Sequence, residues 1–188
     1  DMNLFRQIHK DDWIGEKILA TPGLEGKNIK GEILPAKKGK DRVLRFDEET
    51  VETVEENNKI VLKAKCSGAL QILKGVIGVN PLLEIDGNVG YNTGNINFDG
   101  SVIVYGTVED GFCVTAEKDI SILSNMGMGS VEKIVSHSGN IFIKGGISGK
   151  GKSVIQAGKS IFVKYANDCI LKAQDSINVG FYVLNSEL

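Results

Sequence analysis

The 188-residue chain has 41% hydrophobic and 24% charged residues, so it can bury a core and is not disordered. Its formal net charge of −2 gives no reason to expect nucleic acid as a partner, and no apolar run approaches the ~20 residues of a membrane helix. The 23 glycines beside only 3 prolines favour short strands joined by tight turns.

Residues 1–80 have the pattern of a small β-rich domain. GEKILAT, KGEILP, DRVLRF and GALQIL each show the alternation and the flanking turn signals of a short strand. ETVETVEENNKIVLKA alternates on both sides of Asn57-Asn58, which predicts a hairpin because asparagine tolerates the positive φ of such turns. The opening MNLFRQIHKDDW leaves two interpretations open, a short helix or an extended lead-in. We place the domain boundary at Asn80–Pro81.

Residues 81–188 contain a repeat. LLEIDG, SVIVYG, DISILS, NIFIKG, SIFVKY and SINVGF each place apolar residues two apart. Their first apolar residues, spaced by 19, 18, 21, 20 and 16 positions, are Leu83, Val102, Ile120, Ile141, Ile161 and Ile177. Strand alternation at this period, without a helical stretch, predicts stacked coils whose strands pair in parallel. We therefore expect a parallel β-helix repeat domain of about six coils over residues 81–188.

A second repeated position lies four residues before these apolar residues. Ala116, Ala157 and Ala173 occupy it, and the same count gives His137 in the remaining segment, VSHSGNI. The stretch SNMGMGSVEKIVSH, residues 124–137, is longer and less regular than its counterparts. We expect the coil to bulge or to carry a loop there.

The alternation also assigns the faces of each strand. The middle residues Ile103, Phe142 and Phe162 should point outward, the two phenylalanines as neighbours on adjacent coils. With Lys144 and Lys164 they form the candidate interaction surface. Exposed apolar patches often mark contacts, although an ordinary aromatic ladder would look the same. Phe181 and Tyr182 in the last coil are further candidates for capping the column or for continuing it.

The titratable residues predict neither a metal site nor a cofactor site. Cys66, Cys113 and Cys169 lie far apart, and His9 and His137 stand alone, whereas a zinc site needs about four ligands at short spacing. Unpaired thiols favour a cytoplasmic protein over a disulfide-bonded one. Because the sequence begins at Asp1, we also expect it to be part of a longer protein.

Long ordered runs of glycine and apolar positions carry a family resemblance. GNINFDGSVIVYGTVEDGFCVTAEKDISI and GNIFIKGGISGKGKSVIQAGKSI, preceded by GEKILATPGLEGKNIKGEILPAKKGK and VNPLLEIDGNVGYNTGNINFDG, resemble the bacterial flagellar assembly protein A family over roughly residues 12–188. The resemblance implies an all-β fold, a right-handed parallel β-helix preceded by a small β domain. The coils also resemble the bactofilins, which polymerise into filaments. No catalytic residues are known for the family, so none is transferred.

GISGKGKS, residues 146–153, matches the G-x-x-x-x-G-K-S pattern of phosphate-binding loops. That chemistry needs a helix after the loop, and the β-branched SVIQAGKSIFV that follows alternates like a strand. We therefore interpret GISGKGKS as a corner between strands, with loose anion binding by Lys150 and Lys152 as the remaining alternative.

Parallel β-helices also include polysaccharide lyases and hydrolases, which use clustered carboxylates. The candidate carboxylates are Asp99, Asp110, Asp119, Asp168 and Asp175. Most lie where a turn is expected, and aspartate is a normal turn residue.

The sequence therefore predicts a non-enzymatic cytoplasmic scaffold that presents a β-helix face to protein partners or to copies of itself. A carbohydrate-active enzyme is the alternative, and nucleotide binding at GISGKGKS a remote third.

Overall fold

The computed structural model describes residues 5–188, in which every regular element is a β-strand and no helix occurs. The strands are β1 (Gln7–Ile8), β2 (Trp13–Ile18), β3 (Gly26–Lys27), β4 (Ile33–Leu34), β5 (Val51–Glu56), β6 (Lys59–Ala64), β7 (Gly68–Leu73), β8 (Val76–Asn80), β9 (Leu82–Ile85), β10 (Ile96–Phe98), β11 (Ser101–Val104), β12 (Cys113–Ala116), β13 (Ile120–Ile122), β14 (Lys133–Ser136), β15 (Ile141–Ile143), β16 (Ile147–Ala157), β17 (Ser160–Val163), β18 (Ala166–Ala173), β19 (Ser176–Val179) and β20 (Val183–Leu184). The all-β prediction is confirmed. Among the described residues, no helix is long and apolar enough to span a membrane.

The chain forms two compact units that are not divided by a single cut. The solenoid unit contains residues 80–188 together with residues 67–70 and the N-terminal segment up to His9. The second unit, which we call the ribbon unit, contains residues 10–66 and 71–79. As a boundary between independently folding domains, Asn80–Pro81 stays a prediction.

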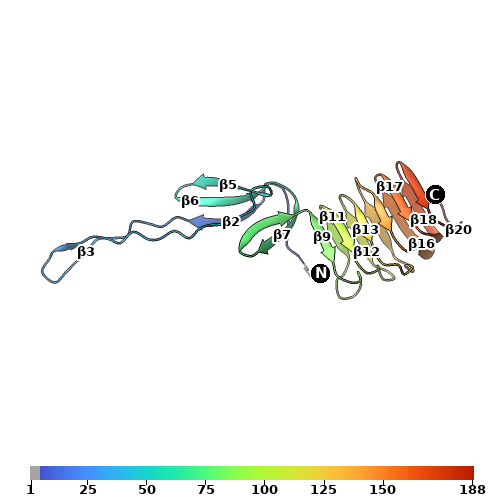
Figure 1. Cartoon of the computed structure of the whole chain (residues 1–188), viewed down its shortest axis with the longest axis horizontal. Coiled ribbons are helices and arrows are strands. Elements are labelled where there is room, and N and C mark those ends of the chain that lie inside the picture. The colour runs from blue at the N-terminus through green and yellow to red at the C-terminus, as the bar shows by residue number, and fades with distance from the viewer. Residues whose placement is uncertain (1–4) are drawn as a thin grey trace. The chain divides into compact units, whose positions relative to one another are not determined.

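Two six-stranded parallel sheets form the main faces of the solenoid unit. One has the order β9-β11-β13-β15-β17-β19, and the other β10-β12-β14-β16-β18-β20 (Figure 1). The first sheet pairs Leu83 with Val102, and the register continues through Ile120, Ile141, Ile161 and Ile177. These are the six residues that the repeat spacing aligned, so the predicted parallel stacking is confirmed.

A third side of the stack is held by the isolated parallel bridges Val89 to Val108 and Met128 to Ile147, and then by the pairs that Ala166 forms with Ile147 and Val183. The inward residues of all three sides form one continuous core. Val102, Ile120 and Ile141 are fully buried there. One coil cannot bury such side chains alone, so the stack is the stable unit.

The coil that contains residues 124–137 departs from the expected alignment at the corner between β14 and β15. Ser136, rather than His137, pairs with both Ala116 and Ala157 in the inward column. The expectation that His137 takes the alanine position is therefore wrong. The corner from β14 to β15 contains one residue more than its counterparts, which pushes His137 out to solvent. Ser136 is buried, and its hydroxyl donates to the Lys118 carbonyl at 2.7 Å.

The N-terminal segment of the solenoid unit is extended rather than helical. β1 pairs antiparallel with the start of β7, Ile8 opposite Gly68. Phe5 packs edge-on against Phe98, with ring centroids 5.4 Å apart, and joins the solenoid core. The extended alternative for the opening segment is therefore confirmed from Phe5 onward, and residues 1–4 lie outside the described range.

The ribbon unit is built around the antiparallel sheet β2-β6-β5. The predicted hairpin is confirmed: β5 and β6 are joined at Asn57 and Asn58, whose φ angles are 39° and 66°. Both asparagines adopt the left-handed conformation that two-residue hairpin loops require. Buried Val61, Leu62 and Ala64 from β6 supply much of this unit's core.

Residues 19–45 form a narrow ribbon in which two chain segments lie side by side, with β3 and β4 towards its turn (Figure 1). The expected strand KGEILP is reduced to the two residues of β4. The expected strand DRVLRF does not form, apart from a single bridge between Phe46 and Ile77. The physical reason is that no neighbouring strand forms a continuous series of backbone hydrogen bonds with this segment. Val43 is therefore exposed.

Candidate functional site

The predicted interaction surface lies on the outer face of the sheet that contains β15 and β17. Phe142 pairs directly with Phe162 across the two strands. The same outward column continues through Ser121 to Ile103. Phe142 and Phe162 are 43% and 39% exposed, whereas Ile103 is half-buried. The alternation predicted these orientations, because inward residues on the same strands have 4% exposure or less.

The two predicted lysines lie immediately beyond this column. Lys144 and Lys164 each follow the last inward residue of β15 and β17, and both are exposed. With Phe142 and Phe162 they line a shallow groove that extends to Asn178 in β19. The Lys164 ammonium also lies 5.4 Å from the centre of the Phe181 ring. The structure therefore brings four of the five predicted residues together, while Ile103 lies two strands further along the sheet.

Sequence reasoning missed Tyr105, which is on the same face near Ile103. Tyr105 is 48% exposed, and its hydroxyl donates a 2.8 Å hydrogen bond to Glu84 on the neighbouring coil. The hydrogen bond to this carboxylate raises the pKa of Tyr105. The signal was present in the repeat, because Tyr105 follows Val104 as Lys144 follows Ile143.

GISGKGKS forms a bulge within a long strand and not a phosphate-binding loop. β16 runs through it from Ile147 to Ala157, so no helix follows the glycines. Its pairing with β18 shifts register between Ser148 and Ser153. Lys150 and Gly151 make the turn with φ angles of 51° and 76°. Without a helix N-terminus there is no array of free amides or dipole to hold phosphates.

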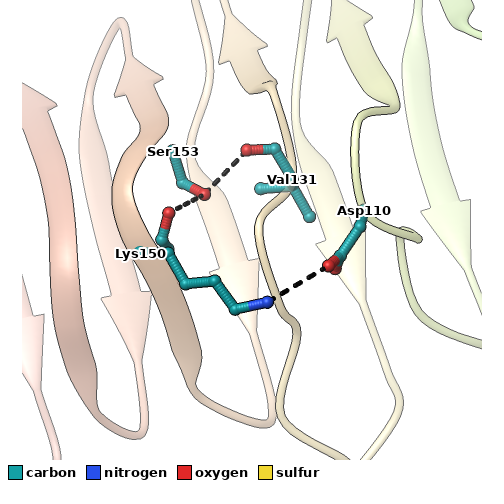
Figure 2. Close-up of polar contacts among 5 residues, drawn as sticks. Asp110, Val131, Lys150 and Ser153 are labelled. Atoms are coloured by element: carbon teal, nitrogen blue, oxygen red, sulfur yellow. Dashed lines mark hydrogen bonds and ion pairs between the residues drawn. The ribbon is translucent and has the colours of Figure 1, made fainter.

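Ser153 shows most directly that the motif has another use. Its side chain is fully buried, and its hydroxyl lies 2.7 Å from the Val131 carbonyl and 3.4 Å from the Gly149 carbonyl (Figure 2). In a phosphate-binding loop this hydroxyl would face a magnesium ion. Here it satisfies backbone carbonyl groups inside the coil. The motif serine is therefore a packing residue.

Gly146 also has a structural explanation. A Cβ added there would lie 2.2 Å from the Tyr165 ring, which covers the glycine. Tyr165 in turn stacks on Tyr182 of the following coil, with centroids 5.3 Å apart and planes 18° apart. Glycine at 146 thus makes room for an aromatic stack, and the backbone does not approach a ligand there.

The two lysines of the motif are solvent-exposed. The Lys150 ammonium lies 3.7 Å from the Asp110 carboxylate, and both side chains are mostly exposed (Figure 2). A pair of this kind contributes little to stability. Asp110 also gives the bulge a negative neighbour, which weighs against anion binding at Lys150.

The five candidate carboxylates do not form a catalytic pair in any arrangement that the contacts support. Asp99 lies 3.1 Å from the His9 imidazole, and Asp110 faces Lys150. Asp119 accepts hydrogen bonds from the backbone and side chain of Asn140 at 2.7 and 3.2 Å. Asp168 lies in β18 opposite the bulge of β16 and has a φ of 49°.

Asp175, the fifth candidate, is exposed at a turn, where its amide donates to the Lys159 carbonyl. Neither the groove at Phe142 nor a smaller depression beside His137 is lined by an acidic residue. Glycoside hydrolysis needs two carboxylates flanking one sugar-binding site. Asp99, Asp110, Asp119 and Asp175 lie between strands, and Asp168 lies within β18.

The remaining chemistry-bearing groups do not converge. Within residues 5–188, no three His, Cys, Asp or Glu side chains are grouped so that they could hold a metal. All three cysteines are free thiols. Burial raises the pKa of both Cys113 and Cys169, whereas an activated thiol has a lowered pKa.

Family comparisons cover almost the whole chain. Residues 81–188 match the family model described as the Flagellar Assembly Protein A beta solenoid domain. Residues 1–75 match the model of the Flagellar Assembly Protein A N-terminal region. The searches of curated proteins and of solved structures gave no match.

Proposed function

Because the chain belongs to the Flagellar Assembly Protein A family, we propose that it acts in flagellar assembly as a non-enzymatic scaffold. Its mechanism is surface presentation: the sheet that contains β15 and β17 offers one face to a protein partner. The single observation that carries this proposal is the exposed pair Phe142 and Phe162 in register on adjacent coils, with Lys144 and Lys164 beside them. We place this activity in the cytoplasm, which agrees with three unpaired thiols.

The chemistry of this face fits a partner with apolar and acidic groups. Two aromatic rings supply apolar area at low entropic cost, and two ammonium groups attract carboxylates. The stacked strands fix the spacing of these side chains before binding, which reduces the ordering cost. No acidic side chain lines the groove itself.

The enzyme alternatives receive no comparable support. The phosphate-binding motif contains a buried serine and lacks its helix, and Asp119 and Asp110 have separate partners in Asn140 and Lys150.

The test compares the wild-type chain with Phe142→Ser/Phe162→Ser as baits in a bacterial lysate, under matched loading. Tyr91→Ser removes an aromatic residue elsewhere on the solenoid unit that is 85% exposed, more than either phenylalanine, and serves as the control. We expect a protein retained by the wild type and the Tyr91 variant to be lost from the double variant. Circular dichroism would show that all three chains fold alike. The same retained proteins for every bait would contradict the proposal.

A further inference from the structure

The ribbon at residues 19–45 carries a strong positive charge in a chain that is acidic overall. It contains seven cationic residues, Lys27, Lys30, Lys37, Lys38, Lys40, Arg42 and Arg45, against three acidic ones, Glu25, Glu32 and Asp41. Asp41 is already used within the unit, since its carboxylate accepts a hydrogen bond from the Ala20 amide and lies 3.7 Å from the Lys17 ammonium. Lys37, Lys38 and Lys40 are all exposed, and no ion pair joins them to a carboxylate of residues 5–188.

The ribbon also exposes large apolar side chains. Leu24 is 94% exposed, and Ile29 and Val43 are similarly open to solvent. Ile33 and Leu34 are consecutive residues of β4, so they point to opposite faces, and both are exposed. A two-stranded ribbon has no layer of its own to cover either face. It therefore has the composition of an element that is buried against something else.

The turn of the ribbon is specifically built. The Asn28 side-chain oxygen accepts hydrogen bonds from the amides of Lys30 and Glu32 at 2.9 and 3.0 Å. Gly31 supplies the left-handed conformation, with a φ of 82°. Ile29 is thereby held outward at the turn.

The same unit contains a surface of opposite charge. Residues 47–56 include six carboxylates and no cation: Asp47, Glu48, Glu49, Glu52, Glu55 and Glu56. β5, the strand that ends this segment, is an edge of its sheet, and within residues 5–188 it pairs with β6 alone. Glu52 and Glu55 are exposed and, as the second and fifth residues of the strand, lie on its two faces. An unpaired strand edge is a ready template for another strand.

We propose that the ribbon of one copy of this chain docks along the β5 edge of a second copy. Lys37 and Lys38 are adjacent in sequence, so an extended chain directs them to opposite faces, as the glutamates of β5 are. Strand addition would place cations against carboxylates on both faces, while backbone groups complete the open edge. The exchange is reciprocal, and the interface therefore closes as a two-fold dimer.

An anionic membrane is the other partner that a basic, apolar element fits, but the distribution of side chains favours protein. A bilayer covers one face of an element that lies on it. Ile33 and Leu34 require cover on both faces. The acidic β5 edge would also be repelled from an anionic surface.

The test uses reciprocal charge reversal, measured by sedimentation equilibrium. Lys37→Glu/Lys38→Glu and Glu52→Lys/Glu55→Lys should each weaken self-association at least about tenfold, because each places like charges across the interface. In a mixture of the two variants, the unchanged ribbon meets an unchanged β5 edge, and the acidic ribbon meets the basic β5 edge. Both contacts then join opposite charges, so a heterodimer should form. Lys159→Glu/Lys172→Glu, the same charge change at exposed solenoid positions, should dimerise like the wild type.

The outcomes separate this inference from its competitors. A wild-type chain that is monomeric at about 100 µM, or variants that fail to pair on mixing although circular dichroism shows them folded, would overturn it. Binding of the wild type to phosphatidylserine vesicles, lost in Lys37→Glu/Lys38→Glu and unaccompanied by dimers, would identify the membrane instead. Loss of dimers in Phe142→Ser/Phe162→Ser alone would assign self-association to the solenoid face and also overturn it.

Discussion

The solenoid unit and the ribbon contain similar side chains in opposite environments. Ile141 of the solenoid is fully buried, whereas Ile29 of the ribbon is fully exposed. Both segments are short, extended and rich in glycine. The difference is that each solenoid strand has an equivalent strand on the next coil, and the ribbon has none within its own unit. Strand propensity alone therefore does not give a core, and repetition of the strand does.

The largest expected difference in unfolding free energy is between an isoleucine-to-alanine substitution in the solenoid core and the same substitution in the ribbon. Ile141→Ala leaves a cavity in the continuous core and should cost ~2–5 kcal/mol of unfolding free energy. Ile29→Ala removes an exposed side chain and should change it by less than ~0.5 kcal/mol. Urea unfolding at low protein concentration measures both. Equal losses would show that the ribbon is packed against its own unit in solution.

Gly146→Ala tests how closely adjacent coils pack. The new methyl group would displace the Tyr165 ring and should cost ~1–3 kcal/mol. Gly15→Ala, in β2 of the ribbon unit, meets no atom within 4 Å and should be much milder. Thermal unfolding compares the two variants. If Tyr165→Ala is added, the further loss caused by Gly146→Ala should largely disappear, and persistence of the full loss would argue against the ring contact.

Ser153→Ala should cost ~1–2 kcal/mol, because it leaves the buried Val131 carbonyl without its donor. Its neighbour Lys152 is exposed, so Lys152→Ala should have almost no effect on unfolding. Isothermal calorimetry with Mg-ATP supplies the second measurement. Tight binding that depends on Lys152 would overturn the interpretation of this segment as a strand bulge.

The smallest effect concerns Cys169 at alkaline pH. Burial raises its pKa above the ordinary 9.0, so the folded state holds the thiol proton more tightly than the unfolded chain. This contribution to stability is complete below the unfolded value and is lost as the pH rises through the folded one. The wild type should therefore lose more stability than Cys169→Ala between about pH 8 and about pH 10. Parallel curves for the two proteins would contradict this assignment.

Sequence patterns predicted the structure correctly at positions that occupy the same environment in every coil. The six apolar residues from Leu83 to Ile177 were aligned correctly, because each packs against the equivalent residue one coil away. The count of four residues before Ile141 predicted His137 where Ser136 is found, because the corner between β14 and β15 contains one extra residue. This residue leaves the alternation on either side unchanged. Similarly, DRVLRF has the alternation of a strand, but alternation cannot supply a pairing partner.

For the candidate site, the alternation placed Phe142 and Phe162 outward on neighbouring strands, as the structure has them. It could not show that Lys164 lies over Phe181, or that Tyr105 reaches Glu84, because both contacts join coils through side-chain rotamers.

By itself, the sequence determined the all-β class, the parallel stacking and which faces point inward, because these follow from a period and an alternation that are local. Only the tertiary structure decided what the polar residues do. Ser153 bonds a carbonyl from another coil, Gly146 accommodates a ring from the next one, and Asp110 faces Lys150 across a corner. These contacts depend on the distance between coils and on the bulge that separates them, which no local pattern records.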